Sequence, residues 1–312
     1  MGGECSMGYL RTFRGHPSSY LEPRNPNYIR GWVEFTAPIP VKNKGFRVIV
    51  ISNSQGFLRE SPNGALSYPQ QLETLLRENG YGENAEVLNW SIPGGACREE
   101  ILLAARTVEH QPDVIILASY NNDFAPKWEK RSLTSIRSDV SYLAYTHGVR
   151  KYLPRSFIHQ SGAFSPHDWL KSNSQFMAWH NRFVGPERLW SVRQQPRPTL
   201  LKRELLRLEY GVSPTLLNHF LDAAHAGKSN PNVLMVSMPL NAGQITNFQD
   251  AKHFYSVAQA VSSSWPSAQS IDASGLIPLG DFSSARHMKP IGHAKFAHFL
   301  FAQLPPPGLN GF

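Results

Sequence analysis

Short apolar segments separated by helical patterns are the feature that most constrains the fold of this chain. Arg47–Ser52, Val114–Ser119 and Asn232–Met238 are rich in β-branched residues and lack the polar alternation of a half-exposed strand. Such runs are typical of strands buried on both faces. A shorter strand is expected at Glu86–Asn89. Because helical segments separate these strands, the order indicates βαβ units and a parallel sheet.

The helical segments complete a three-layer prediction. The apolar side chains of Tyr68–Glu78 recur at helical spacing, and Gly80 then supplies a plausible C-terminal cap. Further helices are expected at Arg98–His110, near Asp250–Val261 and at Pro290–Leu304, and a short strand at Ser270–Asp272. The sequence therefore predicts an α/β domain over residues 46–304, with a central, mainly parallel sheet in an α/β/α sandwich.

The alternation lapses over residues 124–231, which are basic, aromatic-rich and mostly helical in pattern. This segment carries 16 basic and 7 acidic residues, whereas the rest of the chain carries 15 and 16. We expect it to form a cap insertion in the domain, with helices at Ser141–Leu153, Leu200–Tyr210 and Thr215–Ala226. An irregular arm at 1–45 and a tail at 305–312 complete the predicted organisation.

Composition excludes several classes of protein. A hydrophobic content of 41% argues against a largely disordered chain. Two cysteines, Cys5 and Cys97, are too few for a disulfide scaffold or a cysteine-only zinc site. No apolar run approaches the ~18–20 residues of a membrane helix. Residues 1–30 lack the apolar stretch of a signal peptide, so we expect a cytoplasmic protein, or an exported one whose leader or anchor is missing from this chain.

Polar motifs follow the strands, at the edge where parallel sheets place their active sites. The first strand leads into Ser52-Asn53-Ser54-Gln55-Gly56, the second into Gly94-Gly95, and the third into Tyr120-Asn121-Asn122-Asp123. His287 lies just before the closing helix. Each motif alone also has a structural explanation: a helix cap, a turn, a helix start and a surface histidine. Their joint order favours a functional site.

In that order, Ser54, Gly94, Asn122 and His287 resemble the four blocks of the SGNH hydrolases, the GDSL-type esterase family. The resemblance covers about residues 46–123 and 232–300. It implies a flavodoxin-like SGNH hydrolase fold in which His287 takes the proton of the nucleophile Ser54. The backbone N–H groups of Ser54 and Gly94 and the amide of Asn122 would bind the oxyanion. Losing one such donor typically costs ~2.7–4 kcal/mol of barrier.

The sequence departs from the family pattern at three places. Asn53 precedes the serine where the family usually has Asp, and Tyr120 stands where the third block usually has Gly. The family's Asp three residues before the histidine is Ser284 here. We expect Asp281, the nearest upstream carboxylate, to orient His287. Ser284 or a backbone carbonyl is the alternative.

Other reactive side chains fit structural roles better. Cys97 lies close to Gly94, and we expect a buried packing cysteine rather than a reactive thiol. His293 and His298 have no third ligand at metal-binding spacing, so no metal is expected. The sequence contains no phosphate-binding Gly-rich loop and no dinucleotide fingerprint, so we expect no cofactor.

The sequence thus predicts a serine ester hydrolase that removes acetyl or short acyl groups through an acyl-serine intermediate, with carbohydrate as a candidate substrate. An O-acyltransferase with the same site is one alternative, and a non-catalytic member that binds carbohydrate or an anionic polymer is another. The expected partner is a small-molecule or carbohydrate ester, and the basic segment 124–231 also suits an anionic substrate or a membrane surface. Nucleic acid is not favoured, because no recognised module is present. The oligomeric state is left open.

Overall fold

The computed structural model describes residues 42, 45–56, 65–91, 97–129, 149–160 and 205–308. Most of the arm at 1–45, Gly94, the centre of the insertion and the end of the tail lie outside these ranges, so the predictions made for them stay predictions. Among the described residues, no helix combines the length and apolar character needed to cross a membrane.

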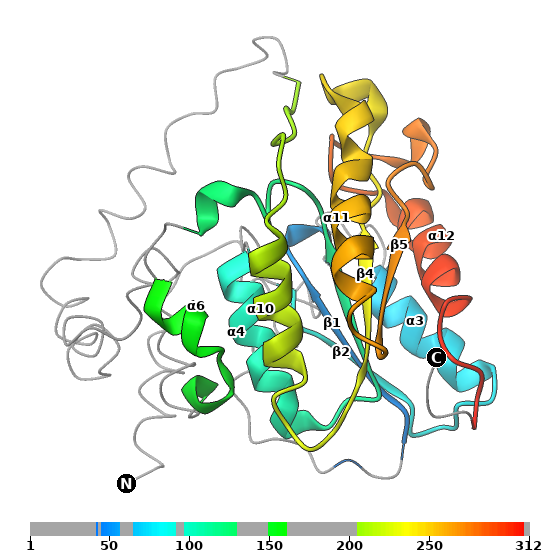
Figure 1. Cartoon of the computed structure of the whole chain (residues 1–312). Helices are drawn as coiled ribbons and strands as arrows, with labels where there is room; N and C mark the ends of the chain where they lie inside the picture. The colour runs from blue at the N-terminus through cyan, green and yellow to red at the C-terminus, as the bar shows by residue number, and fades with distance from the viewer. Residues whose placement is uncertain are drawn as a thin grey trace, which may run out of the picture.

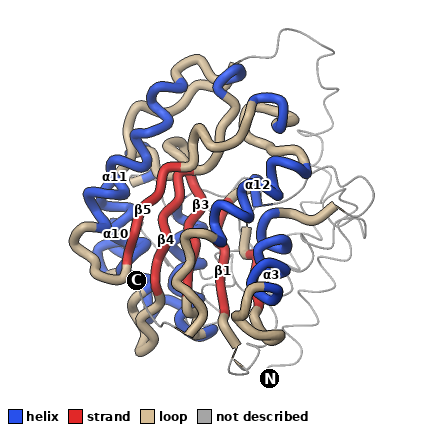
Figure 2. Tube along the Cα trace, turned by 90° about the vertical axis from the view of Figure 1, so that its right-hand side faces the viewer, coloured by secondary structure: helices blue, strands red, loops and turns tan. Residues whose placement is uncertain are grey.

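A five-stranded sheet forms the centre of the domain, and all its strand pairs are parallel (Figures 1 and 2). This confirms the predicted α/β fold with a parallel sheet. The strand order is β2-β1-β3-β4-β5. The strands are β1 (Arg47–Ser52), β2 (Glu86–Asn89), β3 (Val114–Ser119), β4 (Asn232–Ser237) and β5 (Ala268–Asp272).

The strand order itself locates a site. The chain runs from β1 to its neighbour β2 on one side and then crosses to β3 on the other side of β1. The carboxyl ends of β1 and β3 therefore flank the point where the winding direction reverses. Crevices at such switch points bind ligands in open α/β sheets. Ser54 follows β1 at this point, and residues 120–123 follow β3.

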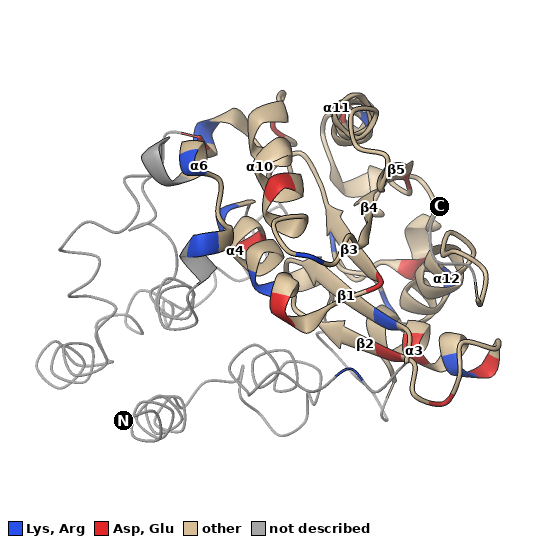
Figure 3. Ribbon diagram, turned by 60° about the horizontal axis from the view of Figure 1, so that its bottom comes forward, with Lys and Arg blue, Asp and Glu red and all other residues tan. Residues whose placement is uncertain are grey.

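Helices cover both faces of the sheet (Figures 1 and 3). Helices α3 (Tyr68–Glu78) and α12 (Pro290–Phe301) pack together on one face. Helices α4 (Cys97–Thr107), α10 (Pro214–Ala224) and α11 (Lys252–Ser262) cover the other. In β1, Val48 and Val50 point to the first layer while Ile49 and Ile51 point to the second. All four side chains are fully buried, which explains the unbroken apolar pattern of this strand.

Helix α10 belongs to one of the helical layers that cover the sheet. It lies inside the range 124–231, yet it packs against α4 and α11 as part of a covering layer. Its Leu217 and Phe220 side chains are fully buried in that core. An apolar face at helical spacing does not reveal whether a helix covers the sheet or builds a separate cap. The covering layer therefore resumes before residue 231.

The helix expected at Leu200–Tyr210 is wrong over its described part. Residues 205–210 form no helix, and Leu206 makes a parallel β-bridge with Ile245. Leu205 is exposed whereas Leu208 is buried, and burial rises and falls along this segment as in an extended chain. By contrast, helical turns do form in two other described segments of the insertion, Val149–Tyr152 and α6 (Arg155–Gln160). The first of these contacts α4.

Candidate active site

Ser54 and His287 meet at the carboxyl end of the sheet, although 233 residues separate them in sequence. Ser54 begins a short 3₁₀ turn directly after β1, and His287 lies in the loop before α12. The Oγ atom of Ser54 is 3.0 Å from Nε2 of His287. This distance is within the range expected for a nucleophile and its general base. Two of the sequence-predicted site residues are thus brought together.

The turn that presents Ser54 is held from both sides. The Oδ1 atom of Asn53 accepts a hydrogen bond from the Gln55 backbone N–H at 3.0 Å, and its carbonyl accepts one from Gly56 at 3.2 Å. A Cβ atom at Gly56 would lie 1.8 Å from Oγ of Ser91. Only glycine therefore fits there. This close approach ties the turn to the residues that follow β2.

A buried carboxylate lies behind this turn. The Nδ2 atom of Asn53 donates to Oδ2 of Asp123 at 2.6 Å, and the Ser119 hydroxyl donates to the same oxygen at 3.1 Å. Asn53 and Asp123 are only 4% and 5% exposed. Sequence reasoning did not identify this pair. The indication of this pair in the sequence was Asn53, an amide at the position where the SGNH hydrolases usually have Asp.

Burial changes the ionisation of the carboxyl groups at this point. It raises the pKa of Asp123 to about 7, against the opposing hydrogen bonds from Asn53 and Ser119. Glu100 of α4 is fully buried as well, and burial together with the charge of Asp123 raises its pKa well above the usual value. Two ionised carboxylates cannot share a buried site without a large electrostatic cost. Glu100 therefore binds its proton more tightly than an exposed glutamate does.

The loop before α12 places Ser284, not Asp281, against the histidine. The Oγ atom of Ser284 is 2.8 Å from Nδ1 of His287. The carboxylate of Asp281 instead accepts a hydrogen bond from Nζ of Lys295 at 2.7 Å. The prediction that Asp281 contacts His287 is therefore wrong. The alternative residue, Ser284, lies next to Nδ1 of His287.

The path of the loop explains this outcome. Phe282 and Met288 form an antiparallel β-bridge, and the Ser283 N–H donates to the carbonyl of His287 at 2.8 Å. This narrow turn places Ser284 opposite the imidazole. The Asp281 carbonyl accepts the Lys289 N–H at 2.7 Å before the turn starts. The Asp281 side chain is thus left on the α12 side, within reach of a lysine.

Asn122 lies at the site edge with its amide turned to the segment 205–210. Its Oδ1 accepts the Glu209 backbone N–H at 2.9 Å, and its Nδ2 donates to the carbonyl of Arg207 at 3.3 Å. An amide nitrogen carries two hydrogens, and the Arg207 carbonyl takes one of them. The oxyanion role of Asn122 stays a prediction, as does that of Gly94, which lies outside the described residues.

Tyr120 and Arg286 form a second feature that sequence reasoning missed. The Arg286 guanidinium donates to the Tyr120 hydroxyl, and its carbon lies 5.8 Å from the centre of the phenol ring. Tyr120 is buried at the end of β3, so its ring is held in a fixed position beside the histidine loop. The indication of this contact in the sequence was Arg286, a cation directly before His287.

Two residues considered at the sequence level have structural roles. Cys97 is completely buried, as expected, and burial raises the pKa of its thiol well above the usual value. The Nδ1 atom of His293 accepts the Tyr68 backbone N–H at 3.1 Å, and the two rings are stacked. Burial lowers the pKa of His293 to about 3. This histidine therefore stays neutral and joins α12 to the start of α3.

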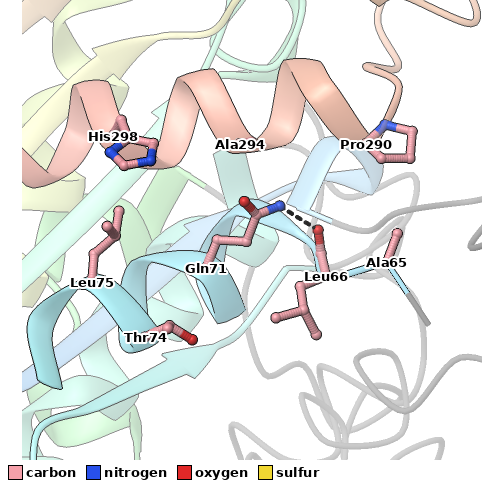
Figure 4. Close-up of a pocket in the computed structure, with 8 residues that line it drawn as sticks. All are labelled: Ala65, Leu66, Gln71, Thr74, Leu75, Pro290, Ala294 and His298. Carbon is pink, nitrogen blue, oxygen red and sulfur yellow. Dashed lines mark hydrogen bonds between the residues drawn. The ribbon is translucent and has the colours of Figure 1, made fainter. Parts of the chain in front are cut away.

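A separate groove of about 500 Å³ lies between α3 and α12 (Figure 4). The amide of Gln71 donates to the Leu66 carbonyl at its rim at 2.7 Å. His298 is the titratable group among its described lining residues, and no nucleophile–base pair converges there. Ser54 and His287 are not among the described residues that line this groove. The groove is lined by Ala65, Leu66, Gln71, Thr74, Leu75, Pro290, Ala294 and His298.

Comparisons with known proteins found solved structures that are similar to this chain at low sequence identity. No protein-family model and no curated protein matches the sequence. The chain is similar to the solved structure of an acetyl xylan esterase, AlAXEase, with a TM-score of 0.42 and 14% identity over 83% of this chain and 100% of that one. For a catalytic mutant of an acetylxylan esterase from Geobacillus stearothermophilus, the TM-score is 0.42 and the identity 12%, over 83% and 94% of the two chains. For a lipase/acylhydrolase from Enterococcus faecalis, the values are 0.38 and 14%, over 85% and 100%.

Proposed function

We propose that this chain is a serine ester hydrolase in which Ser54 is the nucleophile and His287 the general base. The observation that carries the proposal is the 3.0 Å contact between Oγ of Ser54 and Nε2 of His287. The contact lies beyond the carboxyl ends of the strands, at the switch point of the sheet, where α/β enzymes bind their ligands. A serine hydroxyl becomes an effective nucleophile when a base at this distance takes its proton.

The proposed reaction has two halves. Oγ of Ser54 attacks the ester carbonyl carbon while its proton moves to Nε2 of His287, giving a tetrahedral oxyanion. Collapse of this intermediate breaks the bond to the alcohol, which leaves with the proton from Nε2, and the acyl group stays on Ser54. Water then attacks the acyl carbon, again giving a proton to Nε2. That proton returns to Oγ as the carboxylic acid leaves.

The oxyanion would be stabilised by fixed donors at the ends of the strands. We assign the backbone N–H groups of Ser54 and Gly94 and one N–H of the Asn122 amide to this role. The amide is already oriented by its two contacts with the segment 205–210. Donors held in place before the reaction stabilise developing charge more effectively than mobile ones.

The proposed substrates are acetyl or short acyl esters, with carbohydrate as the alcohol. The fixed ring of Tyr120, at a position where the family usually has Gly, supports a small acyl group because it fills space at the end of β3. The basic, aromatic-rich residues of the insertion support a carbohydrate or an anionic alcohol. Transfer of the acyl group to a hydroxyl other than water would use the same steps.

A fluorophosphonate probe tests the proposal without knowledge of the natural substrate. Attack by Oγ forms an oxygen–phosphorus bond and expels fluoride, so the label stays on the nucleophile. We expect peptide mapping to find it at Ser54, and Ser54→Ala to remove it. Ser283→Ala is a matched control, because the hydroxyl of Ser283 contacts the His287 carbonyl rather than the imidazole. Labelling elsewhere, with Ser54 unmodified, would contradict the assignment.

One observation supports a second candidate, a non-catalytic binding protein. The hydroxyl at Nδ1 of His287 is neutral, and a neutral group stabilises an imidazolium less than a carboxylate does. Under this alternative, native protein would bind acetylated carbohydrate, and intact mass would show no label after long exposure to the probe. Titration calorimetry with acetylated and deacetylated oligosaccharides would detect the binding.

A further inference from the structure

The hydroxyl of Ser284 has three nitrogen neighbours in the histidine loop. Its Oγ accepts the backbone N–H of His287 at 3.1 Å and, more weakly, that of Arg286 at 3.5 Å. The third neighbour is Nδ1 of the His287 ring at 2.8 Å, the shortest of the three. The two backbone nitrogens can act only as donors. The ring nitrogen can donate or accept, according to the tautomer.

Counting donors and acceptors decides the direction of the third bond. A hydroxyl oxygen has two lone pairs and one hydrogen. The two backbone N–H groups donate to the Ser284 oxygen at 3.1 and 3.5 Å, and in this arrangement the hydroxyl hydrogen is left for Nδ1. Nδ1 is then the acceptor, and the single proton of the neutral imidazole must lie on Nε2.

This tautomer is the wrong one for catalysis. With its proton on Nε2, the ring donates to Oγ of Ser54 across the 3.0 Å contact and has no lone pair there to accept the serine proton. We infer that Ser284 is a positioning residue that holds resting His287 in the Nε2–H tautomer and thereby restrains the nucleophile. This inference rests on the proposed function. It adds that Ser54 of the wild-type protein reacts more slowly than its placement beside His287 would otherwise allow.

A carboxylate at position 284 would reverse the tautomer. It accepts hydrogen bonds and donates none when ionised, so the same two backbone N–H groups and an Nδ1–H could all be satisfied. Nε2 would then face Ser54 with its lone pair. Asp281 does not supply this carboxylate, because its side chain is bonded to Lys295.

Ser284→Asp is therefore expected to gain function. We expect the rate of fluorophosphonate labelling at Ser54 to rise on the order of 10²-fold, part of the ~10⁴ that a wrong tautomer costs in the well-studied serine triad. Ser283→Asp is the matched control, since it adds the same charge one residue away, at a side chain whose hydroxyl contacts the His287 carbonyl rather than the imidazole. It should leave the rate close to that of the wild type.

Ser284→Ala distinguishes a residue that restrains the His287 ring from one that supports catalysis, even if Ser284→Asp folds poorly. If Ser284 restrained the ring, removal of its hydroxyl would let Nδ1 carry the proton, and the labelling rate would hold or rise. If Ser284 instead accepted a hydrogen bond from Nδ1–H and supported catalysis, the rate would fall. A fall would overturn the inference.

Nitrogen NMR of histidine-labelled protein reads the tautomer directly, without any activity. The His287→Gln variant identifies the two ring signals, and protonated and unprotonated ring nitrogens differ widely in chemical shift. At a pH where the ring is neutral, we expect the proton on Nε2 in wild type and on Nδ1 in Ser284→Asp. A proton on Nδ1 in wild type would overturn the inference and leave the proposed function standing. Absence of Ser54 labelling in both proteins would instead overturn the proposed function, while the NMR result would still decide the tautomer.

Discussion

The nucleophile side and the base side of the site are held by different means. Asn53, beside Ser54, is buried and bonded to a buried carboxylate that belongs to the end of β3. His287 is half-buried in a loop, and its imidazole meets the hydroxyl of a neighbouring residue. The nucleophile side is therefore part of the core, whereas the base side depends on local loop contacts. Changes at the buried residues that support Ser54 should alter stability together with activity, and changes on the base side should alter activity more selectively.

The largest expected effect is the loss of the nucleophile itself. Ser54→Ala should reduce hydrolysis of short-chain p-nitrophenyl esters to background, since the acyl-enzyme cannot form. The side chain is only partly buried, so the melting temperature should stay close to that of wild type. Initial rates and a thermal melt on the same preparations check both statements. Substantial activity in a folded Ser54→Ala variant would place the nucleophile elsewhere.

Asn122 tests whether the nucleophile side also supplies the oxyanion donor. Asn122→Ala should lower kcat by roughly 10²–10³-fold if one amide N–H stabilises the transition state. Asn122→Asp is a sharper variant, because it keeps an oxygen for the Glu209 N–H but replaces the donor with charge. It should lose at least as much activity as Asn122→Ala. An unchanged kcat in both would show that this amide serves only the segment 205–210.

Asp123 should make stability depend on pH. Its pKa rises from 3.8 to about 7 on folding, so the folded state binds the proton more tightly than the unfolded state. This contribution to stability is complete below pH 3.8 and is lost as the pH rises through about 7. Asp123→Asn removes the titration. Denaturant unfolding at pH 5 and pH 8 should show that the stability of the variant relative to wild type increases with rising pH, by about 3 kcal/mol between the two values. An equal difference at both values would contradict the buried ionisation.

The smallest effect is expected on the base side, at Asp281. Asp281→Asn should lower kcat by less than ~10-fold, since its carboxylate pairs with Lys295 rather than with the imidazole, and such a partly exposed ion pair contributes about 0–1 kcal/mol. Lys295→Met removes the same ion pair from the other side and should behave alike. A loss near the ~10⁴ expected of a true orienting acid would erase the contrast between the two sides.

Local patterns in the sequence were enough to predict the sheet and the meeting of two blocks. The central residues of β1 and β3 are apolar because both faces of each strand are covered. Ser54 and His287 follow from their places after β1 and before α12, since parallel strands bring their carboxyl ends to one edge. These features depend on order along the chain and on periodicity, both of which a sequence displays.

Contacts set by loop paths and by distant partners could not be predicted in the same way. The β-bridge between Phe282 and Met288 closes the narrow turn in which Ser284 faces the imidazole. No local sequence pattern predicts this turn. The bond from Asn53 to Asp123 joins residues 70 apart. Likewise, a leucine at 206 suits a helix as well as a strand until Ile245 is placed beside it. In each case the missing information was the neighbour in space.

The long sequence separation of Ser54 and His287 also has a consequence for how the protein matures. β1 is the first of the described strands to be synthesised, yet the serine that follows it meets the histidine only after residue 287 has been made and α12 has docked on α3. That docking is marked by Tyr68, whose N–H reaches His293 and whose ring contacts Phe296. Contacts between such distant residues form slowly. Reactivity at Ser54 therefore reports on the docking of α12 during refolding, and a chain truncated before α12 would carry the serine without completing the proposed site.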